Sequence, residues 1–220
     1  MIVTTSDFGR KQSVERDGNS MGLLFLMLAG VGITPAKPIT ANDWLGQVTY
    51  PAGAKQRGEE GVTFFDVLLS PQGKPVNCTV TRSSGSSELD DASCQMASKR
   101  LRMKPALDEL GQPIHALIHS HLQWSLGSRW AVKRPPDLVI DVNRLPNRAS
   151  EISVALNVKT DVTGRIVACF PALLAETLSE LDTVACSQAG ATLKGVVKDA
   201  SGNAVAAAQT INVSFKTPPP

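Results

Sequence analysis

The sequence "SSELDDASC" occupies residues 86–94, and "SELDTVAC" occupies residues 179–186. Both stretches contain Ser-Glu-Leu-Asp, three variable residues and a cysteine, and their matching positions are 92 residues apart. The other two cysteines of the chain, Cys78 and Cys169, are 91 residues apart. A pattern that recurs at a fixed interval indicates an internal duplication. The sequence therefore predicts two structural repeats.

Each copy of the motif is predicted to begin a helix that follows a β-hairpin. In the first repeat, residues 63–70 and 75–82 alternate between apolar and polar side chains, and "PQGK" between them is typical of a turn. A Ser/Asp-rich helix start follows at Ser86, and the stretch then runs to about Leu101 without glycine or proline. Residues 114–124 alternate again and predict a third strand. The second repeat shows the same order of elements.

We therefore expect an α+β fold of two tandem small domains, each a three-stranded antiparallel sheet with a helix packed on one face. A chain of 220 residues has room for one domain or for two small ones. Residues 44–128 form repeat 1 in this interpretation, and residues 138–217 form a degenerate repeat 2. The linker is residues 129–137, which contain two adjacent prolines.

The cysteines predict one disulfide bond in each repeat. Cys78 and Cys94 fall on the sides of a strand and a helix that are predicted to face each other, and Cys169 and Cys186 occupy the matching places. We expect Cys78 to pair with Cys94 and Cys169 with Cys186. A zinc site is the alternative, but the chain has no Cys-x-x-Cys pair. Disulfides indicate an oxidising compartment.

The N-terminal residues predict export to the periplasm. Residues 1–20 are polar and residues 21–33 are an apolar run, which is shorter than the roughly 20 residues that a membrane-spanning helix needs. Such a run fits the core of a signal peptide over residues 1–36, with Met21 as an alternative start. Cleavage after Ala36 or Ala41 would give a mature chain that begins near Lys37 or Asn42. A retained inner-membrane anchor and a buried cytosolic segment remain alternatives, because residues 1–20 carry no net positive charge.

Three segments of repeat 1 occur in the order and at the spacing of a known family. They are "YPAGAKQRGEEG" at 50–61, "DVLLSPQGKPVNCTVTRSSGSSELD" at 66–90 and "LRMKPALDELGQPI" at 101–114. These segments resemble the opening helix, the hairpin with its helix entry, and the segment before the last strand in the C-terminal domain of the TonB family. Repeat 2 resembles the same domain more weakly, with only a shortened echo of the opening helix at 145–150.

The resemblance implies a non-enzymatic periplasmic module for protein–protein interaction, linked to outer-membrane transport or to the cell envelope. Its implied partner is an envelope protein or a segment of an outer-membrane transporter, which would dock by adding a strand to a sheet edge. A full transducer of the family has an anchor helix and a long proline-rich spacer. Only ten residues separate Ile33 from Trp44 here, so energy transduction is not carried over.

Other functional classes find little support in the sequence. The net charge of +2 with scattered Lys and Arg gives no argument for a nucleic-acid partner. The chain has neither a glycine-rich phosphate loop nor a dinucleotide-binding motif, so no cofactor is expected. The serines of "SSGSS" at 83–87 fit helix capping better than a catalytic nucleophile. We do not expect an enzyme or a membrane-spanning protein.

The strand predicted at 114–124 carries all three histidines of the chain. His115, His119 and His121 have the same parity and therefore project from one face. A solvent-facing polar surface is the plain explanation. In the TonB-like interpretation, this strand is the edge that a partner strand would extend, and a metal-binding envelope protein with ligands at His119 and His121 is the alternative function. The candidate peptide-binding residues are Ile114, His115, Leu117, His119, His121 and Gln123.

Overall fold

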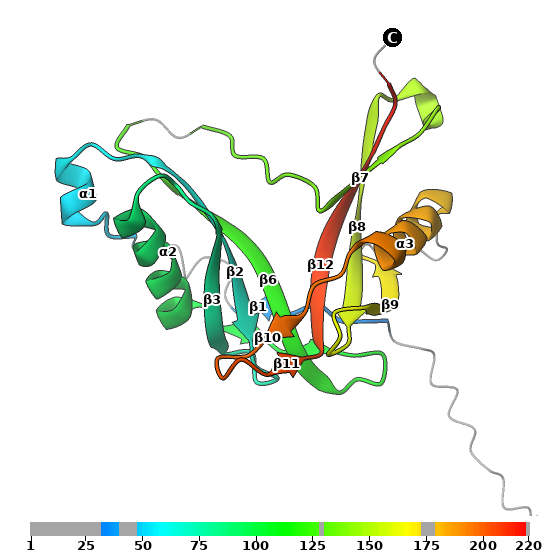
Figure 1. The fold of residues 1–220 in the computed structure, drawn as a ribbon, viewed down its shortest axis with the longest axis horizontal. Helices are drawn as coiled ribbons and strands as arrows, with labels where there is room; N and C mark the ends of the chain where they lie inside the picture. The colour runs from blue at the N-terminus through cyan, green and yellow to red at the C-terminus, as the bar shows by residue number, and fades with distance from the viewer. Residues whose placement is uncertain (1–31, 40–47, 128–129, 173–178, 219–220) are drawn as a thin grey trace, which may run out of the picture.

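The computed structural model describes residues 32–39, 48–127, 130–172 and 179–218 (Figure 1). The first repeat contains α1 (Ala52–Gln56), β2 (Gly61–Leu69), β3 (Pro75–Arg82), α2 (Ser87–Arg100), β4 (Met103–Lys104), β5 (Ala106–Leu107) and β6 (Pro113–Trp124), and the short β1 (Lys37–Pro38) precedes them. The second contains β7 (Leu138–Asp141), the 3-10 turn η1 (Pro146–Arg148), β8 (Glu151–Thr160), β9 (Ile166–Pro171), α3 (Glu180–Thr192), β10 (Val197–Lys198), β11 (Ala204–Val205) and β12 (Ala207–Lys216). The predicted order of hairpin, helix and third strand is present in both repeats.

The doubled Ser-Glu-Leu-Asp motif begins both long helices. Ser86 is the N-cap of α2, and its side chain accepts a hydrogen bond from the main-chain N–H of Leu89. Ser179 caps α3 through a reciprocal pair of hydrogen bonds with Asp182. Such caps satisfy main-chain N–H groups that have no partner inside the helix. The recurrence of the motif is therefore explained by helix initiation.

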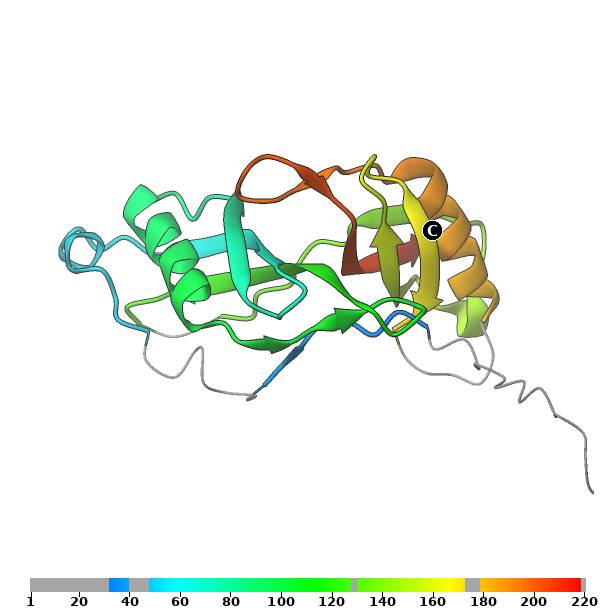
Figure 2. The ribbon, with the colours of Figure 1, turned by 90° about the horizontal axis from the view of Figure 1, so that it is seen from below.

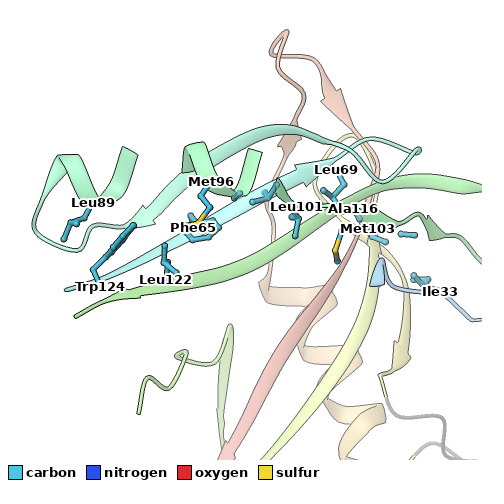
Figure 3. Close-up of a cluster of buried hydrophobic side chains, with 14 of the residues drawn as sticks. Ile33, Phe65, Leu69, Leu89, Met96, Leu101, Met103, Ala116, Leu122 and Trp124 are labelled. Carbon is cyan, nitrogen blue, oxygen red and sulfur yellow. The ribbon is translucent and has the colours of Figure 1, made fainter. Parts of the chain in front are cut away.

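Helix α2 packs against one face of β2, β3 and β6, and this contact forms the larger core. Alternate side chains of β2 enter it, as Figure 3 shows for Phe65 and Leu69. Trp124 is fully buried at the end of β6, and its Nε1 donates to the Oγ of Ser93 at 2.9 Å. A second core lies under α3 and includes Leu156, Val158, Ala185, Ile211, Val213 and Phe215.

The two repeats share one continuous sheet, which differs from the two separate sheets expected from the sequence. The strand order along this sheet is β3-β2-β6-β12-β8-β9, with β7 beside β12. The third strands of the repeats meet in parallel through the pairs Ala207–His115, Ala208–Ala116 and Gln209–Leu117. Beyond this short ladder, β6 and β12 diverge (Figure 1).

Helices α2 and α3 lie on opposite faces of this sheet. Ala208 pairs with Ala116, and both side chains belong to the core under α2. Ile211, three positions further along β12, belongs to the core under α3. Because successive side chains of a strand alternate between faces, positions 208 and 211 point in opposite directions. The repeats are thus related approximately by a half-turn about an axis parallel to the strands.

Both predicted disulfides are present. Cys78 of β3 is bonded to Cys94 of α2, and Cys169 of β9 is bonded to Cys186 of α3. The Cα–Cα separations are 5.6 and 5.8 Å, which are normal for disulfides. Each bond therefore ties a helix to the outermost strand of its own repeat.

The described residues include no helix that is long and apolar enough to cross a membrane. The predicted signal peptide at 1–36 falls mostly outside the described residues, which begin at Gly32.

Candidate binding site

Strand β6, the predicted peptide-binding strand, has neighbours on both sides. Residues 116–124 pair antiparallel with β2 along its whole length. On the opposite side, β12 pairs with residues 115–117. Ile114 pairs with Ala106 of the short strand β5. The expectation of an open edge from Ile114 onward is therefore wrong for residues 114–117, because other strands of the same chain occupy their positions.

The rest of β6 keeps one open side. Within the described residues, no strand pairs with positions 118–123 on the side away from β2. This open stretch begins where β12 diverges from β6 (Figure 1). Successive main-chain groups of a strand point alternately to its two sides. Part of the main chain of residues 118–123 is therefore directed into the gap between the repeats.

The linker crosses this gap. The side-chain amide of Gln123, in the orientation that satisfies both of its groups, bonds the main-chain N–H and C=O of Trp130. At the other end, the N–H of Asp137 donates to the carbonyl of Asn212, and the N–H of Asn212 donates to the Asp137 carboxylate, each at 2.8 Å. Arg134 also pairs with Asp137, at 2.6 Å. The linker is thus attached to β6 and to β12.

His119 joins the two repeats across the face opposite α2. Its Nδ1 lies 2.6 Å from Oδ1 of Asp66 on β2, and its Nε2 lies 3.0 Å from Oε1 of Gln209 on β12. Both ring nitrogens therefore have a protein partner. His121, two residues further, packs its ring 5.5 Å from that of Phe64. Nothing in this arrangement favours the metal interpretation, and no group of three His, Cys, Asp or Glu side chains in the described residues is arranged to hold a metal ion.

Two hollows lie on either side of the Asp66–His119 pair. The first has a volume of about 350 Å³ and extends from Phe64 and Arg82 to the linker residues 134–137. The second has a volume of about 440 Å³ and lies between the β2–β3 hairpin and residues 195–198. In the first hollow the guanidinium of Arg82 lies 3.7 Å above the ring of Phe64. The open stretch of β6 therefore borders a concave, mostly polar surface.

The opposite face of the open stretch is apolar. Ile118 and Ser120 line a hollow of about 130 Å³ together with Pro38, Phe65, Val67, Ala97, Leu101 and Met103. A strand added to β6 would place alternate side chains on these two faces.

This geometry agrees with a comparison of the sequence with protein families. The model of the Gram-negative bacterial TonB protein C-terminal family matches residues 46–126. These residues are a TonB C-terminal domain.

Curated relatives support the same assignment. The chain is similar to Protein TonB of Neisseria meningitidis serogroup C, with 26% identity over 115 residues, which are 48% of this chain and 41% of that protein. It is similar to Protein TonB of serogroups A and B of the same species, with 29% identity over 85 residues, which are 39% of this chain and 30% of those proteins. The match thus spans less than half the length of these relatives.

The serine cluster of the TonB domain has a structural role. The hydroxyls of Ser83 and Ser84 and that of Thr63 donate to the carboxylate of Asp90, which is largely buried, and the N–H of Ser84 donates to it as well. Burial raises the pKa of Asp90, but these hydrogen bonds outweigh it and hold the pKa below its ordinary value. The cluster therefore organises the entry of α2.

The remaining candidates of the TonB domain lie at the junction of the repeats. Leu117 packs with Leu68 and Val197 beneath the β10–β11 hairpin. His115 lies near Asp199, whose pKa is lowered first by a main-chain hydrogen bond from Asn203 and last by the charge of His115. Sequence reasoning missed Arg82, Gln209 and the linker as parts of the site, because they meet β6 only after the repeats have joined. The paired strands β6 and β12 were each predicted, but no local pattern indicated that they would meet.

Proposed function

We propose that this protein is a non-enzymatic interaction module of the bacterial envelope that docks an extended segment of an outer-membrane transporter or of another envelope protein. The TonB C-terminal domain at residues 46–126 supports this class of function. The two disulfides support an oxidising compartment such as the periplasm.

The docking position in this proposal is β6 from residue 118 to residue 123. The observation that carries it is the open side of this stretch, next to a position where β12 already pairs with the same strand. Six residues of strand span roughly 20 Å at about 3.3 Å per residue. Main-chain hydrogen bonds along this length would supply affinity, each contributing roughly 0.5–1.5 kcal/mol.

Selectivity in this proposal comes from the two faces of the docked segment. Side chains on one face would meet His119, His121 and the hollow that Arg82 and Arg134 line. Side chains on the other face would meet the apolar hollow beside Ile118. The preferred segment is therefore one in which polar and apolar residues alternate.

A titration followed by NMR tests this proposal. The ¹⁵N-labelled full chain would be titrated with a transporter-derived peptide of about ten residues. We expect the largest amide shifts at residues 118–123. The control peptide carries proline at alternate positions and lacks the main-chain donors that strand addition requires, so it should cause no such shifts. Shifts that cluster on the outer strands β3 or β9 would refute the assignment of the edge.

A matched pair of histidine variants tests the role of the polar face. His121 lies within the open stretch, whereas His115 lies on the same face of β6 but pairs with β12. We expect His121→Ala to weaken peptide binding about 3- to 10-fold, since a packed aromatic contact contributes roughly 0.5–1.5 kcal/mol. His115→Ala should leave the dissociation constant unchanged. Equal effects of the two variants would show that the peptide does not contact this face.

A further inference from the structure

Residues 32–39 are built into the folded protein, although the sequence places most of them in or beside a leader. Ile33 is 5% exposed and belongs to the core under α2. Figure 3 shows it at the same end of that core as Met103 and Ala116. A buried isoleucine of this kind is a structural residue, because its removal would expose apolar surface and leave a cavity.

The main chain of this segment is hydrogen-bonded to repeat 1. Thr34 and Leu107 exchange two main-chain hydrogen bonds of 2.9 Å, and the N–H of Ile39 donates to the carbonyl of Arg102 at 3.2 Å. Strand β1 pairs antiparallel with β4 through Lys37–Lys104 and Pro38–Met103. The segment therefore extends the first repeat as an additional ordered element.

The same segment also contacts repeat 2. A Cβ atom placed on Gly32 would lie 3.1 Å from the ring of Phe170 on β9, so the main chain approaches that ring closely. Ile33, Pro35 and Ala36 line a small hollow of about 30 Å³ whose other walls include residues 116–118 of β6 and 208–210 of β12. Figure 2 shows the segment, in blue, running from one repeat to the other.

The position of these contacts gives the segment a specific role. Only three residue pairs join β6 to β12, and residues 33–36 lie across this ladder on the face that carries α2. On the other face, the ladder is flanked by the Asp66–His119–Gln209 hydrogen bonds. An ion pair between Lys159 and Glu109 also links the repeats, and its hydrogen bond lowers the pKa of Glu109. The segment is thus one of several contacts that hold the repeats together.

We infer that residues 33–39 remain in the mature protein as a clamp between the repeats, and that any leader is removed at or before Gly32. This places the processing site upstream of Ala36 and Ala41. Gly30-Val31-Gly32 provides small residues at the two positions that leader cleavage selects. Cleavage after Ala36 would instead remove Ile33 from the core and break the Thr34–Leu107 pair.

The N-terminus of the exported protein tests this inference directly. The full chain would be produced in a Gram-negative host, recovered from the envelope fractions and analysed by N-terminal sequencing. A mature chain that begins at or before Ile33, including an uncleaved chain, supports the clamp. A chain that begins after Ile33, for example at Lys37 or Asn42, overturns it.

A pair of isoleucine variants tests the contribution of the clamp to stability. Ile33 is 5% exposed, whereas Ile39 of the same segment is 56% exposed. We expect Ile33→Ala to lower Tm by about 5–10 °C and to speed the exchange of the Leu107 amide. Ile39→Ala should change neither quantity beyond error. Equal effects of the two variants, or no effect of Ile33→Ala, would show that the segment does not hold the repeats together.

Discussion

The two disulfides offer a quantitative comparison between the repeats. Replacing Cys78 and Cys94 with alanine opens a loop with a sequence separation of 16, and replacing Cys169 and Cys186 opens one with a separation of 17. All four cysteines are half-buried. Their replacement by alanine therefore creates no deep cavity, and the effect should come mainly from the lost cross-link.

The chain-entropy treatment gives the expected magnitude. Closing a loop of this length removes roughly 10 cal/mol/K of entropy from the unfolded chain, which corresponds to about 3 kcal/mol at 25 °C. A loss of this size should lower Tm by about 6–12 °C for a chain of this length. Because the two loops are nearly equal, the two double variants should lose nearly equal free energies of unfolding.

Urea denaturation of the wild type and of both double variants measures these losses. Far-UV circular dichroism reports on both repeats, and Trp124 fluorescence reports on the first. A loss below about 1 kcal/mol in either variant would mean that the reduced chain keeps residual structure. Losses that differ between the repeats by more than about 1.5 kcal/mol would refute loop closure as the common cause, since loop length alone predicts almost no difference.

Two further predictions use matched positions in repeat 1. Gly73 and Gly111 both have φ of 74°, but a Cβ on Gly73 would lie 2.0 Å from the Met103 carbonyl oxygen, whereas a Cβ on Gly111 would meet nothing within 4 Å. In denaturation experiments Gly111→Ala should cost roughly 1–2 kcal/mol and Gly73→Ala clearly more; equal costs would contradict the contact. The lowered pKa of Asp90 means that its contribution to stability is present above the pKa of an unfolded aspartate, about 3.9, and is lost as the pH falls through the lower folded pKa. Asp90→Asn should therefore weaken the acid dependence of the urea midpoint, and Asp91→Asn, at an exposed position of the same helix, should leave it unchanged.

The elements within each repeat could be predicted from the sequence because their signals are local. Alternation in β2 and β3, a serine cap before α2 and a turn between the strands each act over a few residues. The disulfides were predictable because they join elements that are neighbours in the sequence. The repetition itself made each assignment in one repeat a check on the other.

The junction of the repeats could not be predicted in the same way. The ladder between β6 and β12 joins residues about 90 positions apart, and its three pairs carry no motif. Ala116 and Ala208 allow close packing at the junction, but alanines are common in the strands of many folds. The role of residues 32–39 was hidden for a related reason, since an apolar run near the N-terminus is also typical of a leader.

The same junction limits where a partner can bind. A partner strand that reached residues 115–117 would have to displace β12 from β6. Ten residue pairs join β12 to β8, so β12 would move only together with repeat 2. That movement would also break the hydrogen bonds of His119 and the contacts of residues 33–36. Docking at residues 118–123 requires none of these losses, and the open stretch is therefore the position that strand addition should favour.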